Sequence, residues 1–434
     1  MSIKKLIQNI PGAEAAIEAL KDVCKDILAV EAFSSERQIH REQPIRVGFF
    51  CQYIPAWAKV EPIYEQMKTD PRFEPYLLCL PSTITNSTLD DPESLENDTY
   101  DYMRNHGYEE AINTLVGKEQ WLDLKKMNLN YVFYPRPYNA RIPVCYRPKY
   151  VCRYSRVCIL MYGMTTTVDT TRITLNRHFM RYVYFYFAET AFAKRINTKK
   201  NWLLHKLGLQ KTLCIGYPVL EQLAKMKNVQ SPSWDFAKKD FRILWTPRWS
   251  TAKDVGGSNF FTYKDFFLQY AQQNTNVDVL MRPHPLMFSN FLQTGEMTQH
   301  QVDAYVAQVE AMPNVELDNQ NQYEATLWGS DVLVTDLSGI VPEYFTTGKP
   351  VIFCITNMEL ELADYFEEMV QRGCYVVNNE AELAACLVAL QRGEDPLAET
   401  RKALIPELFG TAGDNATAHI VEELAKDAQK RGNK

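Results

Sequence analysis

The segment at 330–353, SDVLVTDLSGIVPEYFTTGKPVIF, combines residues that can bind a phosphate with a backbone pattern that would present them. An apolar run ends at Asp336, and Ser338 and Gly339 then begin a predicted helix that includes Glu343. The free N–H groups and dipole at a helix start suit a diphosphate, the Ser338 hydroxyl adds a hydrogen-bonding group, and Gly339 permits close backbone approach. Capping of the helix by Asp336 and Ser338 is the alternative interpretation, because capping and phosphate binding use the same geometry.

The second such segment is Arg282-Pro283-His284-Pro285, which directly follows the apolar run at 277–281. Two prolines make a rigid loop that holds His284 at the end of a predicted strand. A histidine there can donate to a phosphate or act as an acid or base, and Arg282 offers a forked donor for phosphate oxygens. We therefore predict a catalytic role for His284 and substrate binding by Arg282.

Two further loops contain candidate substrate-binding residues. Gly216 and Tyr217 follow an apolar run and form either a hinge turn or a contact with the ligand. The Trp-Thr-Pro-Arg-Trp segment at 245–249 places Thr246 and Arg248 at a strand end. Stacking on a base or contact with a phosphate is one interpretation of this segment, and a structural aromatic corner is the other.

Strands and helices alternate along the whole chain, and this alternation must position these loops. The predicted strands cover 45–53, 74–82, 131–134, 157–162, 182–190, 213–215, 242–246, 277–281, 314–318, 331–335 and 351–355. The longer predicted helices cover 13–31, 59–70, 108–116, 263–273, 381–391 and 416–429. We predict an α/β fold of GT-B type, in which two Rossmann-like domains with parallel sheets face each other across a cleft. The expected division is a helical arm and linker at 1–43, a first domain at 44–212 and a second at 213–434, with the final helix able to pack back on the first domain.

The helix predicted at 13–31 carries an apolar stripe. Its members are Ala16, Ile17, Leu20, Val23, Cys24, Ile27 and Leu28. A stripe with helical spacing predicts a helix that docks without a chemical role of its own.

Composition excludes several classes of protein. The chain has 434 residues, 46% apolar residues and a net charge of −6, which are ordinary values for a globular protein. No apolar run reaches about 18 residues and the start lacks the features of a secretory signal, so we expect a cytoplasmic protein. Its ten cysteines are scattered without a C-x-x-C pair, and a disulfide framework or zinc site is not expected.

The charge is distributed unevenly. Residues 136–211 contain fifteen Lys and Arg but only two acidic residues, a net charge of +13, so the rest of the chain carries −19. Such a block attracts phosphate-rich substrates or the anionic inner face of a membrane, although a solvated basic surface is the simpler interpretation. No nucleic-acid-binding motif is present, and we expect no nucleic-acid partner.

In order along the chain, five segments resemble the CDP-glycerol glycerophosphotransferase family, which contains teichoic-acid primases and polymerases and related capsule enzymes. These segments are GYP (216–218), ILWTPRW (243–249), RPHP (282–285), the segment at 330–353 and GTAGDNATAHIVEEL (410–424). The resemblance covers about 213–425 and extends only in general layout to the first domain. It implies that the second domain binds the nucleotide donor, whose diphosphate His284, Asp336 and Ser338 would hold. The family's second Ser is Gly339 here.

The largest departure from the family concerns the base that accepts the proton of the acceptor hydroxyl. The family's His-Gly pair falls on Tyr162-Gly163, and a tyrosine with a pKa near 10 is a poor base at neutral pH unless its surroundings lower that value. Candidates for this lowering are Arg153, Arg156 and Arg172. Asp169, His178 and Glu189 are alternative bases within the same basic region.

The sequence thus predicts a transferase that moves a glycerol- or ribitol-type polyol phosphate from a CDP-activated donor to an acceptor hydroxyl during teichoic-acid or capsule synthesis. The acceptor is expected to contain phosphate or to be lipid-linked, with peripheral contact to the inner face of the membrane. No D-x-D cluster suited to a metal–nucleotide is present, so we predict a reaction without metal or other cofactor. The alternatives are a GT-B glycosyltransferase that uses a nucleotide sugar and a catalytically silent nucleotide-binding subunit.

Overall fold

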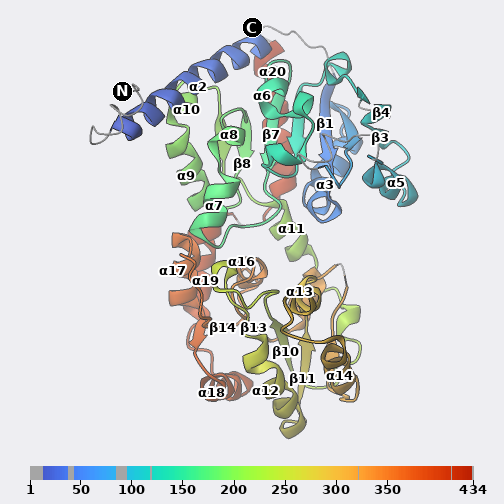
Figure 1. Ribbon diagram of the computed structural model, residues 1–434, viewed down its shortest axis with the longest axis vertical. Helices are drawn as coiled ribbons and strands as arrows, with labels where there is room; N and C mark the ends of the chain where they lie inside the picture. Colours follow the sequence, from blue (N-terminus) through green and yellow to red (C-terminus); the bar gives the residue numbers. More distant parts are fainter. Residues whose placement is uncertain are drawn as a thin grey trace, which may run out of the picture.

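The computed structural model describes residues 13–37, 44–84, 95–117, 120–320, 322–411 and 413–432. Two parallel sheets form the centres of two lobes stacked along the long axis of the molecule (Figure 1). This arrangement confirms the predicted α/β class with two parallel sheets.

The first sheet has seven parallel strands in the order β3-β2-β1-β6-β7-β8-β9. Their bounds are β1 (Ile45–Cys51), β2 (Phe73–Cys79), β3 (Ile112–Asn113), β6 (Tyr131–Tyr134), β7 (Arg156–Leu160), β8 (Phe185–Phe187) and β9 (Lys211–Leu213). A separate hairpin is formed by β4 (Leu115–Gly117) and β5 (Gln120–Trp121). The central strands are apolar along nearly their whole length, as expected for a parallel sheet covered on both faces.

The second sheet has six parallel strands in the order β12-β11-β10-β13-β14-β15. Their bounds are β10 (Phe241–Thr246), β11 (Val277–Met281), β12 (Val315–Leu317), β13 (Val332–Thr335), β14 (Val351–Cys354) and β15 (Tyr375–Val377). The strand order reverses next to β10, and ligands of open parallel sheets bind beyond the carboxyl ends at such a point.

Helices surround both sheets. Those of the first half are α2 (Ala13–Arg37), α3 (Ile54–Thr69), α5 (Asp98–Asn105), α6 (Pro148–Val151), α7 (Val168–Thr174), α8 (Arg177–Met180), α9 (Ala191–Lys200) and α10 (Trp202–Lys206). Those of the second half are α11 (Pro218–Lys225), α12 (Phe260–Gln273), α13 (Met287–Thr294), α14 (Gln299–Glu310), α15 (Glu324–Gly329), α16 (Ile340–Phe345), α17 (Asp364–Gly373), α18 (Glu380–Gln391), α19 (Ala398–Phe409) and α20 (Ala416–Gly432).

The helix predicted at 108–116 is wrong. A helix forms earlier, as α5, where the side chain of Asn97 accepts from the N–H of Tyr100 and caps its start. Gly107 follows with φ +92 and ends the helical path, and the next apolar residues pair with the edge of β2 as β3. The strand predicted at 182–190 is also shorter, because only Phe185–Phe187 pairs with its neighbours.

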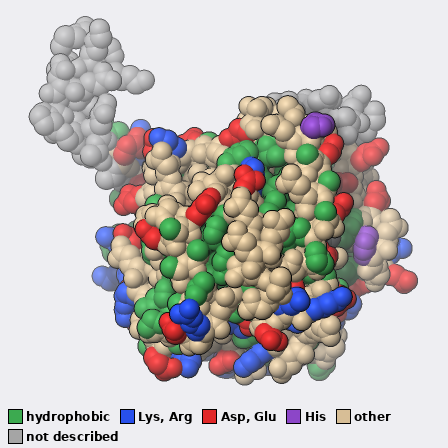
Figure 2. All heavy atoms as spheres, turned by 90° about the horizontal axis from the view of Figure 1, so that it is seen from below, with side chains coloured by type: hydrophobic (Ala, Val, Ile, Leu, Met, Phe, Trp, Pro, Cys, Tyr) green, Lys and Arg blue, Asp and Glu red, His purple; other side chains and the backbone are tan. Residues whose placement is uncertain are grey.

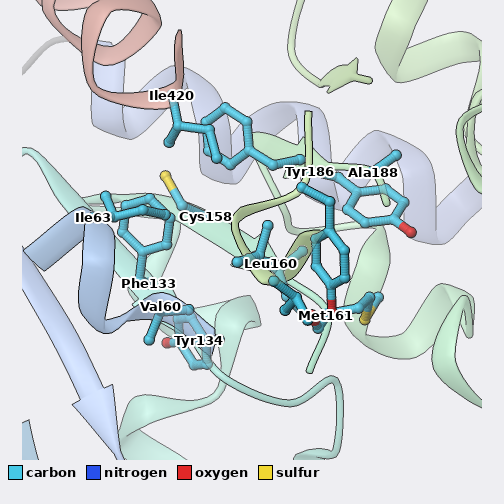
Figure 3. Packing of buried hydrophobic residues seen from close by; sticks show 14 of the residues in the cluster. Val60, Ile63, Phe133, Tyr134, Cys158, Leu160, Met161, Tyr186, Ala188 and Ile420 are labelled. Carbon is cyan, nitrogen blue, oxygen red and sulfur yellow. Dashed lines mark hydrogen bonds between the residues drawn. The ribbon is translucent and has the colours of Figure 1, made fainter. Parts of the chain in front are cut away.

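The core of the first domain lies between its sheet and helices α3 and α20 (Figure 3). Val60 and Ile63 come from α3 and Ile420 from α20, and all three pack against side chains of β6 and β7. α20, the last helix of the chain, therefore covers the first sheet, although its sequence neighbours belong to the second half.

Helix α2 docks through the face opposite to its apolar stripe. Its inward face buries Ala29, Ala32 and Phe33, and it also carries acidic side chains that pair with arginines: Asp22 and Asp26 with Arg181, and Glu36 with Arg156. Leu20 and Ile27 of the stripe are 65% and 60% exposed. The stripe thus points to solvent, contrary to what its hydrophobicity suggested.

The surface at the far end of the second domain mixes acidic and basic side chains (Figure 2). Among the described residues, no helix is long and apolar enough to cross a membrane.

Candidate functional site

Three loops of the second domain meet at the carboxyl ends of β10, β11 and β13, which are neighbours in the sheet. The N–H of Arg248 donates to Oδ2 of Asp336 at 3.2 Å, which joins the loop after β10 to the loop after β13. The N–H of His284 donates to the carbonyl of Pro247 at 3.4 Å, which joins the loop after β11 to the loop after β10. The structure thus brings together Arg248, His284, Asp336 and Ser338, from segments up to ninety residues apart.

Asp336, at the end of β13, accepts hydrogen bonds from the backbone of the loop between β10 and α12. Its side chain is buried, and Oδ2 accepts the N–H groups of Arg248 and Asn259 at 3.2 and 3.1 Å. Burial raises the pKa of this carboxyl to about 7. Its other oxygen, Oδ1, is buried without a hydrogen-bond partner among the described residues. Asp336 therefore holds the backbone of Arg248 and Asn259 in place.

The side chain of Arg248 also connects the loop after β10 to the loop after β13. The guanidinium donates to the carbonyls of Val255 and Leu337, and burial lowers its pKa. A Cβ at Gly256 would lie 2.8 Å from both Nε of Arg248 and Cδ2 of Leu337, and the φ of Gly256 is +108. Only glycine fits this position without strain.

The part of the loop between β10 and α12 that follows residue 249 was not among the residues singled out from the sequence. It contributes Gly256, Gly257 and Asn259, whose side-chain amide donates to the carbonyls of Cys354 and Ile355 at 3.1 Å each. The signal that could have identified it is the Gly-Gly-Ser-Asn run at 256–259, which directly precedes a helix.

His284 is exposed at the rim of this region, and its hydrogen bonding selects one tautomer. Nδ1 accepts the N–H of Leu286 at 3.2 Å. Packing of the ring, followed by the positive charge of Arg248, lowers its pKa to about 4, so the imidazole is neutral at pH 7. A neutral ring that accepts at Nδ1 has its proton on Nε2. His284 therefore presents a neutral N–H donor.

Ser338 and Gly339 lie between β13 and α16. The Ser338 hydroxyl accepts the N–H of Ile340 at 3.4 Å, and Gly339 is exposed with open space where a Cβ would point. Helix α16 is short, since it begins at Ile340 and ends at Phe345. Its dipole is correspondingly small, and an anion here would bind mainly to local N–H and O–H groups.

Arg282 and Glu343 flank this region and already have partners. The guanidinium of Arg282 donates to Asp318 at 2.6 Å and to the carbonyl of Gln320 at 2.9 Å. Glu343 is buried, and its Oε2 accepts the hydroxyl of Tyr323 at 2.7 Å. Lys59 of α3 donates to the same hydroxyl at 2.9 Å, so this chain of hydrogen bonds links the two domains.

Thr246, Gly216 and Tyr217 lie inside the fold. The hydroxyl of Thr246 donates to that of Thr335 at 2.8 Å between neighbouring strands. Gly216 has φ +104 and makes the turn that leads into α11. Tyr217 is 1% exposed, and its hydroxyl donates to the carbonyl of Met161 in the first domain at 2.8 Å. This pair therefore forms a hinge turn attached to the first domain.

Tyr162 follows β7 at the carboxyl end of the first sheet and is 37% exposed. Its hydroxyl lies 3.3 Å from that of Tyr138, and the guanidinium of Arg136 lies within electrostatic range of it. Arg136 is therefore a cation near Tyr162. Asp169 is exposed at the start of α7 and pairs with Arg172 at 2.8 Å.

The arginines predicted to act on Tyr162 are engaged elsewhere, and this prediction is wrong for Arg156 in particular. Its side chain is buried at the amino end of β7 and pairs with Glu36 and Asp427. Arg153 lies 3.7 Å from Glu31 of α2. Strand polarity explains the difference, because residues at opposite ends of β7 are neighbours in sequence but face opposite edges of the sheet.

Of the alternative bases, Glu189 is the buried one. It follows β8, is 3% exposed, and accepts the hydroxyl of Tyr186 at 2.7 Å. Burial raises its pKa to about 7. His178 is exposed on α8.

The described residues contain no group of three or more His, Cys, Asp or Glu side chains suited to a metal ion. A pocket of about 410 Å³ lies between Trp121 and Tyr154 in the first domain, and one of about 390 Å³ lies between α3 and α11. Neither is lined by the residues at the carboxyl ends of the second sheet.

Comparison with known proteins gives one family match. The model of the CDP-glycerol:poly(glycerophosphate) glycerophosphotransferase family matches residues 167–426. This range includes all the donor-side residues described above, as well as Asp169. No curated protein matches the sequence at a significant level.

Solved structures resemble the whole chain. The wall teichoic acid polymerase TagF is 15% identical, with a TM-score of 0.55 over 97% of this chain and 99% of that one. A UDP-N-acetylglucosamine 2-epimerase is 16% identical, with a TM-score of 0.54 over 89% and 96%. The S. aureus MnaA–UDP complex is 13% identical, with a TM-score of 0.55 over 87% and 95%. These likenesses confirm the GT-B fold.

Proposed function

The chain belongs to the CDP-glycerol:poly(glycerophosphate) glycerophosphotransferase family, and on this premise we propose that it transfers glycerol phosphate from CDP-glycerol to an acceptor hydroxyl in the synthesis of a teichoic-acid-type surface polymer. The observation that carries the proposal is the neutral His284, whose Nε2–H donor lies at the same sheet edge as Ser338 and Gly339. A neutral donor beside open backbone suits a diphosphate.

In the proposed reaction, the oxygen of the acceptor hydroxyl attacks the phosphorus that carries glycerol. The bond from this phosphorus to the bridging oxygen breaks, and CMP leaves with the electron pair. His284 and the Ser338 hydroxyl hydrogen-bond the diphosphate as charge develops on the leaving phosphate. We propose that neither a metal ion nor another cofactor takes part.

The proton of the acceptor hydroxyl passes to a base on the first domain. Tyr162 is the candidate at the carboxyl end of β7, with Arg136 as a nearby cation. Asp169 is exposed but paired with Arg172, and Glu189 is buried. We favour Tyr162 because it combines exposure with a neighbouring cation.

The tyrosine at this position also supports a second function. Without a strong base the chain would bind a nucleotide and remain catalytically silent, as a subunit of a surface-polymer complex. Release of CMP from CDP-glycerol in the presence of polymer acceptors distinguishes the two, because a silent subunit releases none.

The proposal includes peripheral contact with a membrane. A surface polymer that grows on a lipid carrier is held at the bilayer, and an enzyme that acts on it must reach that surface. Ribitol- and capsule-type substrates remain alternatives for the same site.

Calorimetric titration with CDP-glycerol, CDP-ribitol, UDP-N-acetylglucosamine and a CMP-sugar tests the donor. We expect CDP-glycerol to bind most tightly, and His284→Ala to weaken it at least about tenfold because a hydrogen bond to a charged group is lost. His300→Ala is the matched control, since His300 is an exposed histidine on α14. Preference for UDP-N-acetylglucosamine or unchanged binding by His284→Ala would contradict the proposal.

A further inference from the structure

An arginine at the carboxyl edge of the first sheet lacks an acidic partner. Arg136 follows β6 and is half-buried, and its Nε is buried without a hydrogen-bond partner among the described residues. No carboxylate in the described part of the chain pairs with it, whereas Arg156 and Arg181 of the same domain both pair with acids. A guanidinium withdrawn from water without a counter-charge is costly, so this place in the fold favours an anionic ligand.

The surrounding side chains fix the orientation of this guanidinium. Its Nη2 donates to Oε1 of Gln52 at 3.0 Å, and its central carbon lies 5.0 Å from the centre of the Tyr53 ring. Gln52 is 2% exposed, and its Nε2 donates to the carbonyls of Pro81 and Arg141. The arginine is therefore oriented before any ligand binds, which lowers the entropy lost on binding.

This arginine lies beside the candidate base. Tyr53 follows β1, Arg136 follows β6 and Tyr162 follows β7, and these three strands are neighbours in the sheet. The hydroxyl of Tyr162 lies 3.3 Å from that of Tyr138, which belongs to the same loop as Arg136. An anion bound by Arg136 would thus lie next to the tyrosine that is proposed to receive the acceptor's proton.

The same edge of the sheet faces the second domain. The carbonyl of Met161 accepts the hydroxyl of Tyr217 at 2.8 Å, and the carbonyl of Thr166 accepts the N–H of Ala363 at 3.0 Å. Met161 and Thr166 lie on either side of Tyr162 in the loop after β7. Arg136 is therefore on the acceptor side of the boundary between the two domains.

A second cation strengthens the need for an anion. Arg141 is exposed in the loop that also contains Arg136, and its charge opposes that of Arg136. Two neighbouring guanidinium groups repel each other unless an anion lies between them. Elsewhere in the basic block at 136–211 this need is already met, because Arg181 and Lys211 pair with acids of α2 and α20.

We infer that Arg136 and Arg141 bind the phosphodiester that joins the terminal polyol of the acceptor to the rest of its chain. A planar guanidinium matches the oxygens of a phosphate, and the hydroxyl at the end of that polyol then lies one unit away, beside Tyr162.

This inference rests on the proposed function and narrows its acceptor. The chain extends a polymer that already ends in a polyol phosphate, so an earlier transfer of the same class must supply the acceptor. An uncharged terminal unit would leave the two arginines without a counter-charge.

The diphosphate of the donor is the other phosphate near this boundary. The loops that contain Arg248, His284 and Ser338 hydrogen-bond to one another and belong to the second domain. None of their described residues hydrogen-bonds Arg136, which is bonded within the first domain. The geometry thus favours the acceptor's phosphate, and contact with the donor is an outcome that the test below detects.

Binding of a fluorescent tri(glycerol phosphate) tests the inference, with fluorescent triglycerol as the matched probe without phosphate. Anisotropy is measured on the full chain with saturating CMP. We expect tri(glycerol phosphate) to bind at least about tenfold more tightly than triglycerol, and Arg136→Gln to remove that advantage because a charged hydrogen-bond donor is lost. Arg136→Lys keeps the charge and should recover part of the affinity.

Arg392→Gln is the matched control, since Arg392 is an exposed arginine at the end of α18 in the second domain. It should bind tri(glycerol phosphate) like the unmodified chain. Equal binding of the two probes, or equal affinity of Arg136→Gln and Arg392→Gln, would overturn the inference.

The donor and the fold are checked on the same variants. Arg136→Gln should bind CDP-glycerol as the unmodified chain does, raise the KM for tri(glycerol phosphate), and unfold at the same or a higher temperature, because an unpaired charge has been removed. Weakened CDP-glycerol binding would assign Arg136 to the donor, and a lower unfolding temperature with intact oligomer binding would assign it to the fold. Either result overturns the inference.

Failure of the proposed function would look different. If the unmodified chain did not bind CDP-glycerol, the donor assignment would be wrong, while the dependence of tri(glycerol phosphate) binding on Arg136 would still be measurable.

Discussion

Glu189 is a carboxyl group that the fold keeps away from water at the end of β8. Its pKa rises to about 7 on burial, and its Oε2 accepts the hydroxyl of Tyr186 at 2.7 Å. A folded-state pKa above the unfolded value means that the group stabilises the fold fully below about pH 4.5 and that this contribution is lost as the pH rises through about 7.

Glu189→Gln should therefore remove part of the pH dependence of stability. Relative to the variant, the unmodified chain should lose about 1 to 3 kcal/mol of unfolding free energy between pH 4.5 and pH 8. Urea unfolding of both proteins at several pH values measures this difference. A difference that is constant with pH would show that Glu189 is not held neutral.

The tautomer of His284 is set by a neighbouring backbone group. From the sequence it was a candidate donor, acid or base, and the bond from the N–H of Leu286 to Nδ1 leaves Nε2 as the donor. A residue that stays neutral at pH 7 is suited to donate to a phosphate and less suited to store a proton, since its pKa is about 4.

At the scale of elements, two glycines of the donor loops have different reasons to be glycine. Gly256 has φ +108 and no room for a Cβ, whereas Gly339 lies in the ordinary helical region with φ −66 and faces open space. The first glycine serves the fold, and the second leaves space for a ligand.

Alanine substitution should separate these roles. Gly256→Ala should destabilise the protein by about 1 to 2 kcal/mol or more, because of its left-handed backbone and the contact with Arg248. Gly339→Ala should change stability by less than about 0.5 kcal/mol but weaken CDP-glycerol binding. Thermal unfolding and calorimetric titration of both variants measure this contrast. Full donor affinity in Gly339→Ala would show that no ligand approaches the backbone there.

At the scale of the whole molecule, α20 ties the end of the chain to the first domain. Asp427 accepts from Tyr131, Tyr184 and Lys211 at 2.7, 2.8 and 2.9 Å, and pairs with Arg156. Although burial opposes it, the charges of Arg156 and Lys211 hold the pKa of Asp427 below its ordinary value. The carboxylate is thus a buried junction between α20 and three strands.

Asp427→Ala should cost about 3 to 5 kcal/mol of unfolding free energy, because it leaves a buried cation short of its counter-charge. Lys426→Ala is the control, since Lys426 is the adjacent residue of α20 and its side chain is 58% exposed. Chemical unfolding curves compare the two variants. Equal stability would mean that the junction contributes nothing net.

The sequence by itself determined the two-sheet α/β organisation, the positions of most strands and the segments that form the donor loops. These features depend on local patterns: apolar runs make buried strands, and the residues after Met281 and Thr335 must lie at the carboxyl edge of a parallel sheet. The family resemblance rested on the same local segments. The roles of His284, Ser338 and Tyr162 in the reaction remain predictions.

Only the tertiary structure decided which face of α2 is buried, which arginine lies near Tyr162 and how Asp336 is used. Hydrophobicity predicted that the stripe of α2 would dock, but Arg177 and Arg181, about 150 residues away, required the acidic face instead. Arg156 and Tyr162 are close in sequence but lie at opposite ends of β7. The physical reason is the same in each case: ion pairing and hydrogen bonding join groups that are distant along the chain, and a local pattern contains no information about those partners.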